Sequence, residues 1–316
     1  MVHCDCIGLL RFLCEVIRVT PSEQTVRMRA LLLVAALTAV ALAGDGSNVK
    51  AKYLDLLTAL ATRDQALFNA SVDEHANFDI TGWGNPGACG PSVQRDAVWA
   101  SYIQQFNTSR LNPVKVMAAD GLLLAHVEFA GFMNPANAQS DIVIENNVFH
   151  LATTAGSPAG KITAFREISA FAPTADDTKF LTTVAALNSA WTTGNSDGYK
   201  AHWDPSLKFE FNYVGATKDP YVVNFTDFEA YAPVLPLSGP SRQGLLGQAA
   251  ACGVLAVRVW IVQGKLNLHG PPAIQDSIIF AQTKPGHQGK WVYAFQLLDA
   301  PPQPGGPRGR GIFPMP

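Results

Sequence analysis

The alternation of apolar and polar positions repeats along this chain. Residues 118–131 read AADGLLLAHVEFAG, and residues 250–264 read AACGVLAVRVWIVQG. Each segment has small residues, one variable position and a glycine, followed by large side chains that alternate between two faces. A period of two residues is typical of a β-strand. Each segment therefore predicts a turn followed by a long strand.

Two further pairs of segments keep almost the same offset. FDI at residues 78–80 matches FEF at residues 209–211, and AF at residues 164–165 matches AF at residues 294–295. Anchors at nearly constant spacing indicate an internal repeat. The sequence therefore predicts two copies of one domain, with a boundary near residues 170–177.

The spacing of apolar residues predicts that each copy begins with helices. Apolar side chains recur at helical spacing in residues 53–68, and Thr174 is a predicted N-cap before the opening helix of the second copy. The apolar stripe of that helix comprises Phe180, Leu181, Val184, Leu187 and Trp191. A further helix is expected at residues 94–106 of the first copy and at residues 225–235 of the second.

Strands are predicted to complete both copies. Short strands at residues 76–80 and 207–211 follow the first helices, and longer alternating strands end each copy in a hairpin. This order is typical of an α+β fold, with helices packed on one face of a curved antiparallel sheet. The two domains are assigned to residues 50–171 and 174–300, and the Pro/Gly-rich residues 301–316 to a disordered tail.

The segment LNSAWTTGNSDGYKAHWDPSLKFEF, residues 187–211, resembles the opening of the SnoaL-like, nuclear-transport-factor-two-like superfamily. There a helix ends in a tryptophan and a glycine–acid turn, and a second helix leads into the first strand. The matching residues here are Trp191, Gly194, Asp197, Tyr199 and Phe209. The resemblance implies two tandem cone-shaped domains, each a sheet around a pocket. It also implies an intramolecular pseudo-dimer, because members commonly pair sheet to sheet.

The resemblance implies a type of chemistry as well. Catalytic members include cyclases, dehydratases, isomerases and epoxide hydrolases, which move protons with Asp, His, Tyr or Arg in an apolar cavity. Burial raises the pKa of a carboxyl group toward neutrality, and a nearby donor stabilises a developing oxyanion. We therefore expect a small apolar molecule as the partner, and neither a cofactor nor a metal.

Three residues of the first copy are the candidate catalytic groups. Asp79 is expected at a strand end where some members place an acid–base carboxylate, although a register shift of one residue would move it to the opposite face. A solvent-facing carboxylate is the alternative for Asp79. His126 and Glu128 alternate on one face of a strand and could form a proton-transfer pair. The same pattern also fits an outer sheet face or a contact between domains.

The second copy does not repeat these groups, since Arg258 and Trp260 stand at the positions of His126 and Glu128. At most one active pocket is therefore expected, in the first copy. His150, in the apolar strand NNVFHLA, is interpreted as a core or rim residue. The histidines lack H-x-x-x-H and H-x-H spacing and the chain has no C-x-x-C, so metal binding is not expected.

Composition describes a globular chain without a basic surface. The 316 residues are 48% hydrophobic and 15% charged, with a formal net charge of −2, so nucleic acid is not an expected partner. No stretch of eighteen apolar residues is present, which argues against a membrane-spanning bundle.

The N-terminus predicts secretion. Met28-Arg29 and the apolar run that follows form a signal-peptide pattern over residues 28–43, so no membrane association is expected after cleavage. Residues 1–27 indicate a mispredicted start or one part of a two-part targeting sequence. Glycosylation sequons at Asn69, Asn107 and Asn224 fit a secreted protein. Two cysteines, Cys89 and Cys252, remain after cleavage, and they either form one disulfide or stay as separate buried thiols.

Three functions stay open at the level of the sequence. The first is a secreted acid–base enzyme of the cyclase, dehydratase or isomerase type. The second is a carrier for a lipophilic ligand, which would need a cavity that is apolar all round. The third is a pseudo-dimeric interaction module whose pockets are filled by large side chains.

Overall fold

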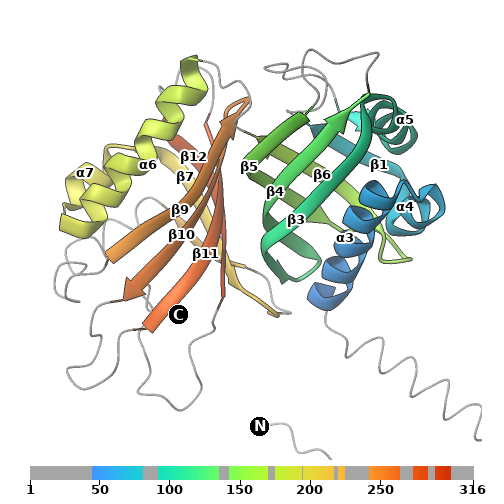
Figure 1. Cartoon of the computed structure of the whole chain (residues 1–316). Helices are drawn as coiled ribbons and strands as arrows, with labels where there is room; N and C mark the ends of the chain where they lie inside the picture. Colours follow the sequence, from blue (N-terminus) through green and yellow to red (C-terminus); the bar gives the residue numbers. More distant parts are fainter. Residues whose placement is uncertain are drawn as a thin grey trace, which may run out of the picture. The chain divides into compact units, whose positions relative to one another are not determined.

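A computed structural model of the chain (Figure 1) describes residues 45–80, 92–134, 142–169, 175–193, 195–216, 220–224, 242–263, 273–283 and 289–299. The predicted leader segments, the predicted tail, the helix expected at residues 225–235, and Cys89 lie outside the described residues. The predictions made for them stay untested.

The first half of the chain opens with helices and continues into a six-stranded sheet in the order β2-β1-β6-β5-β4-β3. Its elements are α3 (Asp45–Thr62), α4 (Gln65–Ser71), β1 (Val72–Ile80), β2 (Val93–Gln94), α5 (Arg95–Gln105), β3 (Phe106–Ala119), β4 (Leu122–Met133), β5 (Ile142–Thr153) and β6 (Ile162–Ser169).

The second half has the same plan, with a six-stranded sheet in the order β8-β7-β12-β11-β10-β9. Its described elements are α6 (Ala175–Thr193), α7 (Ser196–Lys200), β7 (Trp203–Tyr213), β8 (Tyr221–Asn224), β9 (Arg242–Ala251), β10 (Val254–Gln263), β11 (Ala273–Gln282) and β12 (Trp291–Leu298). The α+β class and the tandem arrangement are confirmed. One detail differs from the antiparallel prediction, because β1 pairs with β6, and β7 with β12, in parallel.

The repeated sequence at the start of the long strands forms the same hairpin turn twice. Asp120 and Gly121 have φ angles of 46° and 68°, and Cys252 and Gly253 have φ angles of 56° and 71°. Two successive residues with positive φ are what a two-residue type I′ hairpin requires, and glycine adopts this conformation without steric cost. Cys252 is disulfide-bonded. Its partner lies outside the described residues, which contain no other cysteine.

The caps of two short helices show which positions of the two halves are equivalent. Asp64 accepts a hydrogen bond from the backbone N–H of Leu67, and Asn195 accepts one from the backbone N–H of Gly198. Both side chains stand between the long first helix and a short second helix. Asp and Asn are preferred at such positions because their oxygens satisfy free N–H groups of the first turn. Asp64 and Asn195 are therefore equivalent positions.

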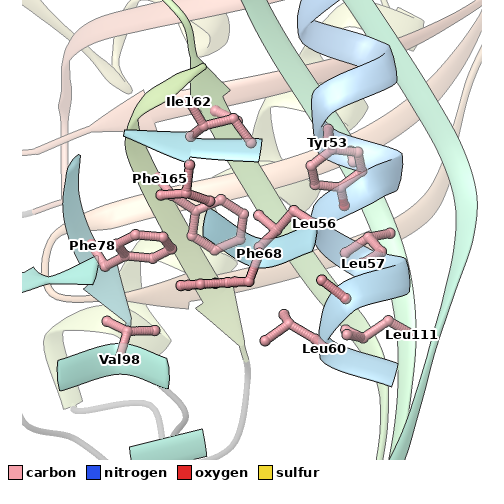
Figure 2. Packing of buried hydrophobic residues seen from close by; sticks show 14 of the residues in the cluster. Tyr53, Leu56, Leu57, Leu60, Phe68, Phe78, Val98, Leu111, Ile162 and Phe165 are labelled. Atoms are coloured by element: carbon pink, nitrogen blue, oxygen red, sulfur yellow. The ribbon is translucent and has the colours of Figure 1, made fainter. Parts of the chain in front are cut away.

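Alternation along the first sheet places two apolar cores on its opposite faces. In β4, Leu123, Ala125 and Val127 join the helix-covered core, which also contains residues of α3, α4 and α5. Figure 2 shows part of this core, with Tyr53, Leu56 and Leu60 of α3 near Phe68, Phe78 and Phe165. The opposite face carries Leu124 of β4 and Phe149 of β5, which belong to a separate cluster.

We call this separate cluster the shared core, because it contains residues of both sheets. Both sheets belong to one compact unit, Asp45–Pro316. The buried members of the shared core are Met117, Ala119, Leu124, Phe149, Ile168, Ala249, Val254, Ala256, Ile278, Phe280, Phe295 and Leu297. The Lys115 ammonium on β3 lies 2.7 Å from an Asp299 carboxylate oxygen after β12, which adds a charged contact. No helix in the described ranges is long and apolar enough to cross a membrane.

Candidate functional site

Three polar side chains lie inside the helix-covered core of the first domain. His150 alternates along β5 with Val148 and Ala152, which both belong to that core. Glu167 stands directly opposite His150 on β6, two residues after the core residue Phe165. Tyr53 of α3 reaches them from the helix layer, so a helix and two strands bring these groups together.

Hydrogen bonds join the three side chains in a row. The Tyr53 hydroxyl lies 2.7 Å from His150 Nδ1, and His150 Nε2 lies 3.2 Å from Glu167 Oε2. The exposed fractions of the three residues are 0%, 1% and 2%. Burial of ionisable groups is costly unless they are hydrogen-bonded, and each of these groups has a partner. We call this row the Tyr–His–Glu network.

The donor and acceptor types fix the proton positions once Glu167 is ionised. A carboxylate only accepts hydrogen bonds, so His150 carries its proton on Nε2 and donates it to Glu167. His150 Nδ1 is then an acceptor, and the Tyr53 hydroxyl donates to it. This is a hydroxyl, base and orienting carboxylate in series, the arrangement that lets a buried hydroxyl exchange a proton.

Electrostatics keep the nearby phenols protonated. Burial raises the pKa of Tyr53 well above its ordinary value, and the charge of Glu167 raises it further. Burial and then Glu167 also raise the pKa of Tyr102 on α5, while Arg63 lowers it. Both phenols are therefore hydrogen-bond donors at neutral pH, and neither rests as a phenolate.

A second carboxyl group lies on the same face of the sheet. Glu145 of β5 stands opposite Phe129, which belongs to the helix-covered core. Burial, followed by the charge of Glu167, raises the pKa of Glu145 to about 7. Burial therefore favours the protonated form of Glu145 more than water does.

The second domain has none of these groups at the equivalent positions. Ala125 pairs with His150, and its counterpart Val257 pairs with Ile279, so the register pair that corresponds to His150 and Glu167 is Ile279 and Gln296. The AF segments matched in the sequence are therefore offset by one residue in the structure. Counted back from the equivalent caps, the position of Tyr53 is taken by Val184. Gln296 donates to the Ser277 hydroxyl over 2.9 Å, a neutral pair. The same fold thus forms without the network.

Asp79, predicted as a catalytic group, lies on the other face of the sheet. Phe78 and Ile80 pack in or against the helix-covered core, so the side chain between them projects away from it. There the Asp79 carboxylate accepts hydrogen bonds from the Arg166 guanidinium, and both side chains are about one-third exposed. A shift of one residue in a strand moves each side chain to the opposite face, and the sequence alone did not determine the register of this strand.

His126 and Glu128 share one face of β4, as predicted, and it is also the face opposite the helices. The His126 ring stacks on Phe149 of the shared core with ring centroids 4.6 Å apart. A Cβ atom added at Gly247 of β9 would lie 2.9 Å from this ring, so His126 contacts the second sheet. Burial, and to a smaller extent the charge of Arg258, lower the pKa of His126.

Glu128 is exposed and accepts a hydrogen bond from Asn112. The structure does not bring Asp79 or Glu128 together with the Tyr–His–Glu network. It gives no support to an acid–base site that joins Asp79 with His126. A catalytic role for the three predicted residues stays an untested prediction.

The network was missed because each member fits an ordinary pattern when considered alone. Tyr53 belongs to a helical apolar stripe, and His150 is a single histidine in an apolar strand. The signal was in the comparison of the two copies. Where one copy has Tyr, His and Glu on inward-facing positions, the other has Val184, Ile279 and Gln296, which indicates that the polar groups are not needed for folding.

Comparisons with known structures return proteins of the predicted class. A protein from Jannaschia sp. CCS1 assigned as a SnoaL-like polyketide cyclase is 13% identical, with a TM-score of 0.32, over 40% of this chain and 90% of its own. A protein from Kribbella flavida assigned as a ketosteroid isomerase is 12% identical, with a TM-score of 0.31, over 42% of this chain and 87% of its own. A cystatin-fold protein from Novosphingobium aromaticivorans is 14% identical, with a TM-score of 0.31, over 37% of this chain and 96% of its own.

Each of these matches covers about one domain of the present chain. At such identity the likeness concerns the fold and not the chemistry. No known protein family and no curated protein matches the sequence. Among the described residues, no group of three or more His, Cys, Asp or Glu side chains is placed to hold a metal ion.

Proposed function

We propose that the first domain binds a small apolar molecule and catalyses proton transfer on it, as in a cyclase, dehydratase or isomerase that needs no cofactor. One observation carries this proposal: a buried Tyr–His–Glu network is present in one copy of the fold and replaced in the other. Replacing buried charged groups by apolar ones is often neutral or stabilising, so a network retained in one copy alone indicates a use other than folding.

The network can take up one proton without moving its heavy atoms. The Tyr53 oxygen accepts a proton from the substrate while its own proton passes to His150 Nδ1. The proton on His150 Nε2 passes to Glu167 in the same step. The surrounding apolar side chains exclude water, which strengthens these hydrogen bonds. Such general acid–base catalysis contributes about 10²–10⁴-fold to a rate.

A carrier for a lipophilic ligand would need an interior that is apolar all round. The buried network argues against that function. The second domain lacks the network, since its inward-facing positions are Val184, Ile279 and Gln296. We propose that the second domain is the non-catalytic half of an intramolecular pseudo-dimer, which the shared core supports. We also propose, from the N-terminal sequence, that the protein is secreted.

Deuterium exchange tests the proposed activity without knowledge of the natural substrate. A panel of small apolar ketones is incubated with the protein in D₂O, and loss of C–H signal next to the carbonyl is followed by proton NMR. We expect Tyr53→Phe to slow exchange of the best compound by about 10²-fold or more, because it removes the hydroxyl that relays the proton.

Glu74→Gln is the matched control, since Glu74 of β1 is ionisable and exposed and has no role in the candidate site, and it should exchange like the unmodified protein. Equal rates for Tyr53→Phe and the control would contradict the proposal. Compounds that bind tightly but never exchange would support the carrier.

Gly247→Ala tests the contact between the sheets. The added Cβ would lie 2.6 Å from Asn147 Oδ1 and 2.9 Å from His126 Cε1, so we expect a loss of about 1–3 kcal/mol in the free energy of unfolding. Urea unfolding of Gly247→Ala, His126→Ala and the double variant forms a cycle. The cost of Gly247→Ala should fall by about half in the His126→Ala background. Strict additivity would contradict this contact.

A further inference from the structure

Asn107 stands at an irregular point of an edge strand. The strand order leaves β3 at one edge of the first sheet. In the register of β3 with β4, Asn107 is an extra residue between the pairs Phe106–Met133 and Thr108–Phe132. Such a β-bulge interrupts the ladder and changes the direction of a side chain. Asn107 is exposed, and it begins one of the three glycosylation sequons of the chain.

Arg63, in the turn between α3 and α4, holds the backbone at Asn107 in place. Its guanidinium donates hydrogen bonds to the carbonyl oxygens of Asn107 over 2.8 Å and of Phe106 over 3.3 Å. Hydrogen bonds from a charged donor are stronger than those between neutral groups. The exposed Asn107 side chain therefore extends from a fixed backbone.

The sequon at Asn69 has a different setting. Asn69 lies in α4 and is half-buried, with its carboxamide oxygen enclosed. Its backbone carbonyl accepts a hydrogen bond from Lys161 over 2.9 Å, and Ser71, the third residue of the sequon, has an exposed fraction of 0%. A glycan is bulky and needs a surface position. Asn107 fits this requirement better than Asn69, and the side chain of Asn224 lies outside the described residues.

Three large apolar side chains lie exposed beside Asn107. Phe132 of β4 pairs on one side with Thr108, the residue after Asn107, and on the other side with Ile142 of β5. Ile144 lies two residues further along β5, on the same face. The exposed fractions of Phe132, Ile142 and Ile144 are 52%, 42% and 62%, and we call these three residues the outer patch. Single exposed apolar residues are ordinary, but a contiguous group marks a contact surface.

We propose that Asn107 is an N-glycosylation site and that the first sugars of its glycan cover the outer patch. The inference rests on the proposed secretion and not on the proposed proton transfer. In the group transfer, Asn107 Nδ2 forms a bond with C1 of the first sugar of a lipid-linked oligosaccharide diphosphate. The bond between C1 and the diphosphate oxygen breaks, its electron pair stays on the diphosphate, and Nδ2 loses one proton to water.

A sugar ring suits the outer patch. Its C–H groups form an apolar face that packs on a side chain such as Phe132, while its hydroxyl groups bond to water. A bulky polar group also limits the pairing of an edge strand with a second chain. β3 contacts the second domain near its other end, through Lys115 and Ala118. About 25 Å of extended strand separates Asn107 from Lys115, which leaves room for the glycan.

Mass spectrometry of the whole chain, secreted from a eukaryotic cell line, identifies the occupied sequons. Asn224→Gln is the background, so that any glycan is on Asn69 or Asn107. We expect one glycan, whose release by a peptide N-glycosidase leaves an aspartate at the position of Asn107. Asn107→Gln should remove the glycan completely, and the matched variant Asn69→Gln should leave it in place.

Sedimentation velocity of the same variants tests the cover of the outer patch. Asn107→Gln should form more associated species than Asn69→Gln, because the outer patch and the edge of β3 are then free to associate. Adding Phe132→Ser and Ile144→Ser to Asn107→Gln should reverse this association. Equal association of Asn107→Gln and Asn69→Gln would overturn the cover.

A bare Asn107 or a glycan on Asn69 in the secreted protein would overturn the glycan site. The same chain placed behind an established signal peptide separates the glycan site from the proposed secretion. If Asn107 is glycosylated in that form alone, the proposed secretion is wrong and the glycan site stands. If Asn107 carries no glycan in either form, the glycan site is wrong.

Discussion

Glu167→Ala is expected to lower the free energy of unfolding by about 3–5 kcal/mol, because it removes one partner of a buried hydrogen-bonded pair. The His150 ring would remain in the apolar core with an N–H that has lost its acceptor, and the cavity left by the side chain adds to the cost. Urea unfolding at pH 7, followed by tryptophan fluorescence, measures this loss.

The second domain offers a matched control for this substitution. Gln296 occupies the same position in the other sheet and makes one neutral hydrogen bond, so Gln296→Ala should cost about 1–2 kcal/mol. Glu167→Gln keeps an acceptor for His150 and should cost about 1 kcal/mol. If Glu167→Ala costs no more than Gln296→Ala, then Glu167 is not the buried partner that the network requires.

Much of the fold was predictable because it depends on period and repetition. The turn at Asp120-Gly121 and its copy at Cys252-Gly253 set the offset between two long strands, and both are hairpins in the structure. The parallel pairing of β1 with β6 was not predictable in this way. Alternation along β1 shows which residues share a face, but not which distant strand becomes the neighbour.

The candidate site was less predictable, because alternation along one strand fixes neither its register nor its neighbouring strand. Whether Asp79 or a neighbour faces the interior depends on a single residue of register, and the pattern FDI gave no independent check. His126 illustrates a second difficulty. It shares a face with Leu122 and Leu124, an alternation that fits a cavity as well as a surface covered by a second domain.

The role of His150 becomes visible only when the two copies of the domain are compared. Alone in an apolar strand, a histidine is most often a satisfied core residue, and here it is indeed fully satisfied. Only its replacement by Ile279 in the second copy, together with Gln296 opposite, indicates that the polar arrangement is dispensable for folding. Three coordinated differences on inward-facing positions carry more information than any one residue type.

The triple variant Tyr53→Val, His150→Ile and Glu167→Gln gives the first domain the residues of the second. We expect it to fold with a stability equal to or above that of the unmodified protein, since these side chains already pack in the same fold and no charge is left buried. We expect its rate of ketone deuterium exchange to fall by about 10³-fold or more, because the proton relay is gone.

The central claim is that the Tyr–His–Glu network serves proton transfer and not stability, and one paired measurement on this triple variant tests it most directly. Urea unfolding and deuterium exchange are recorded on the same preparation, beside the unmodified protein. The account predicts an unfolding midpoint that is unchanged or higher, with exchange lost. An unfolding midpoint that falls steeply, or exchange that continues at the original rate, would contradict it.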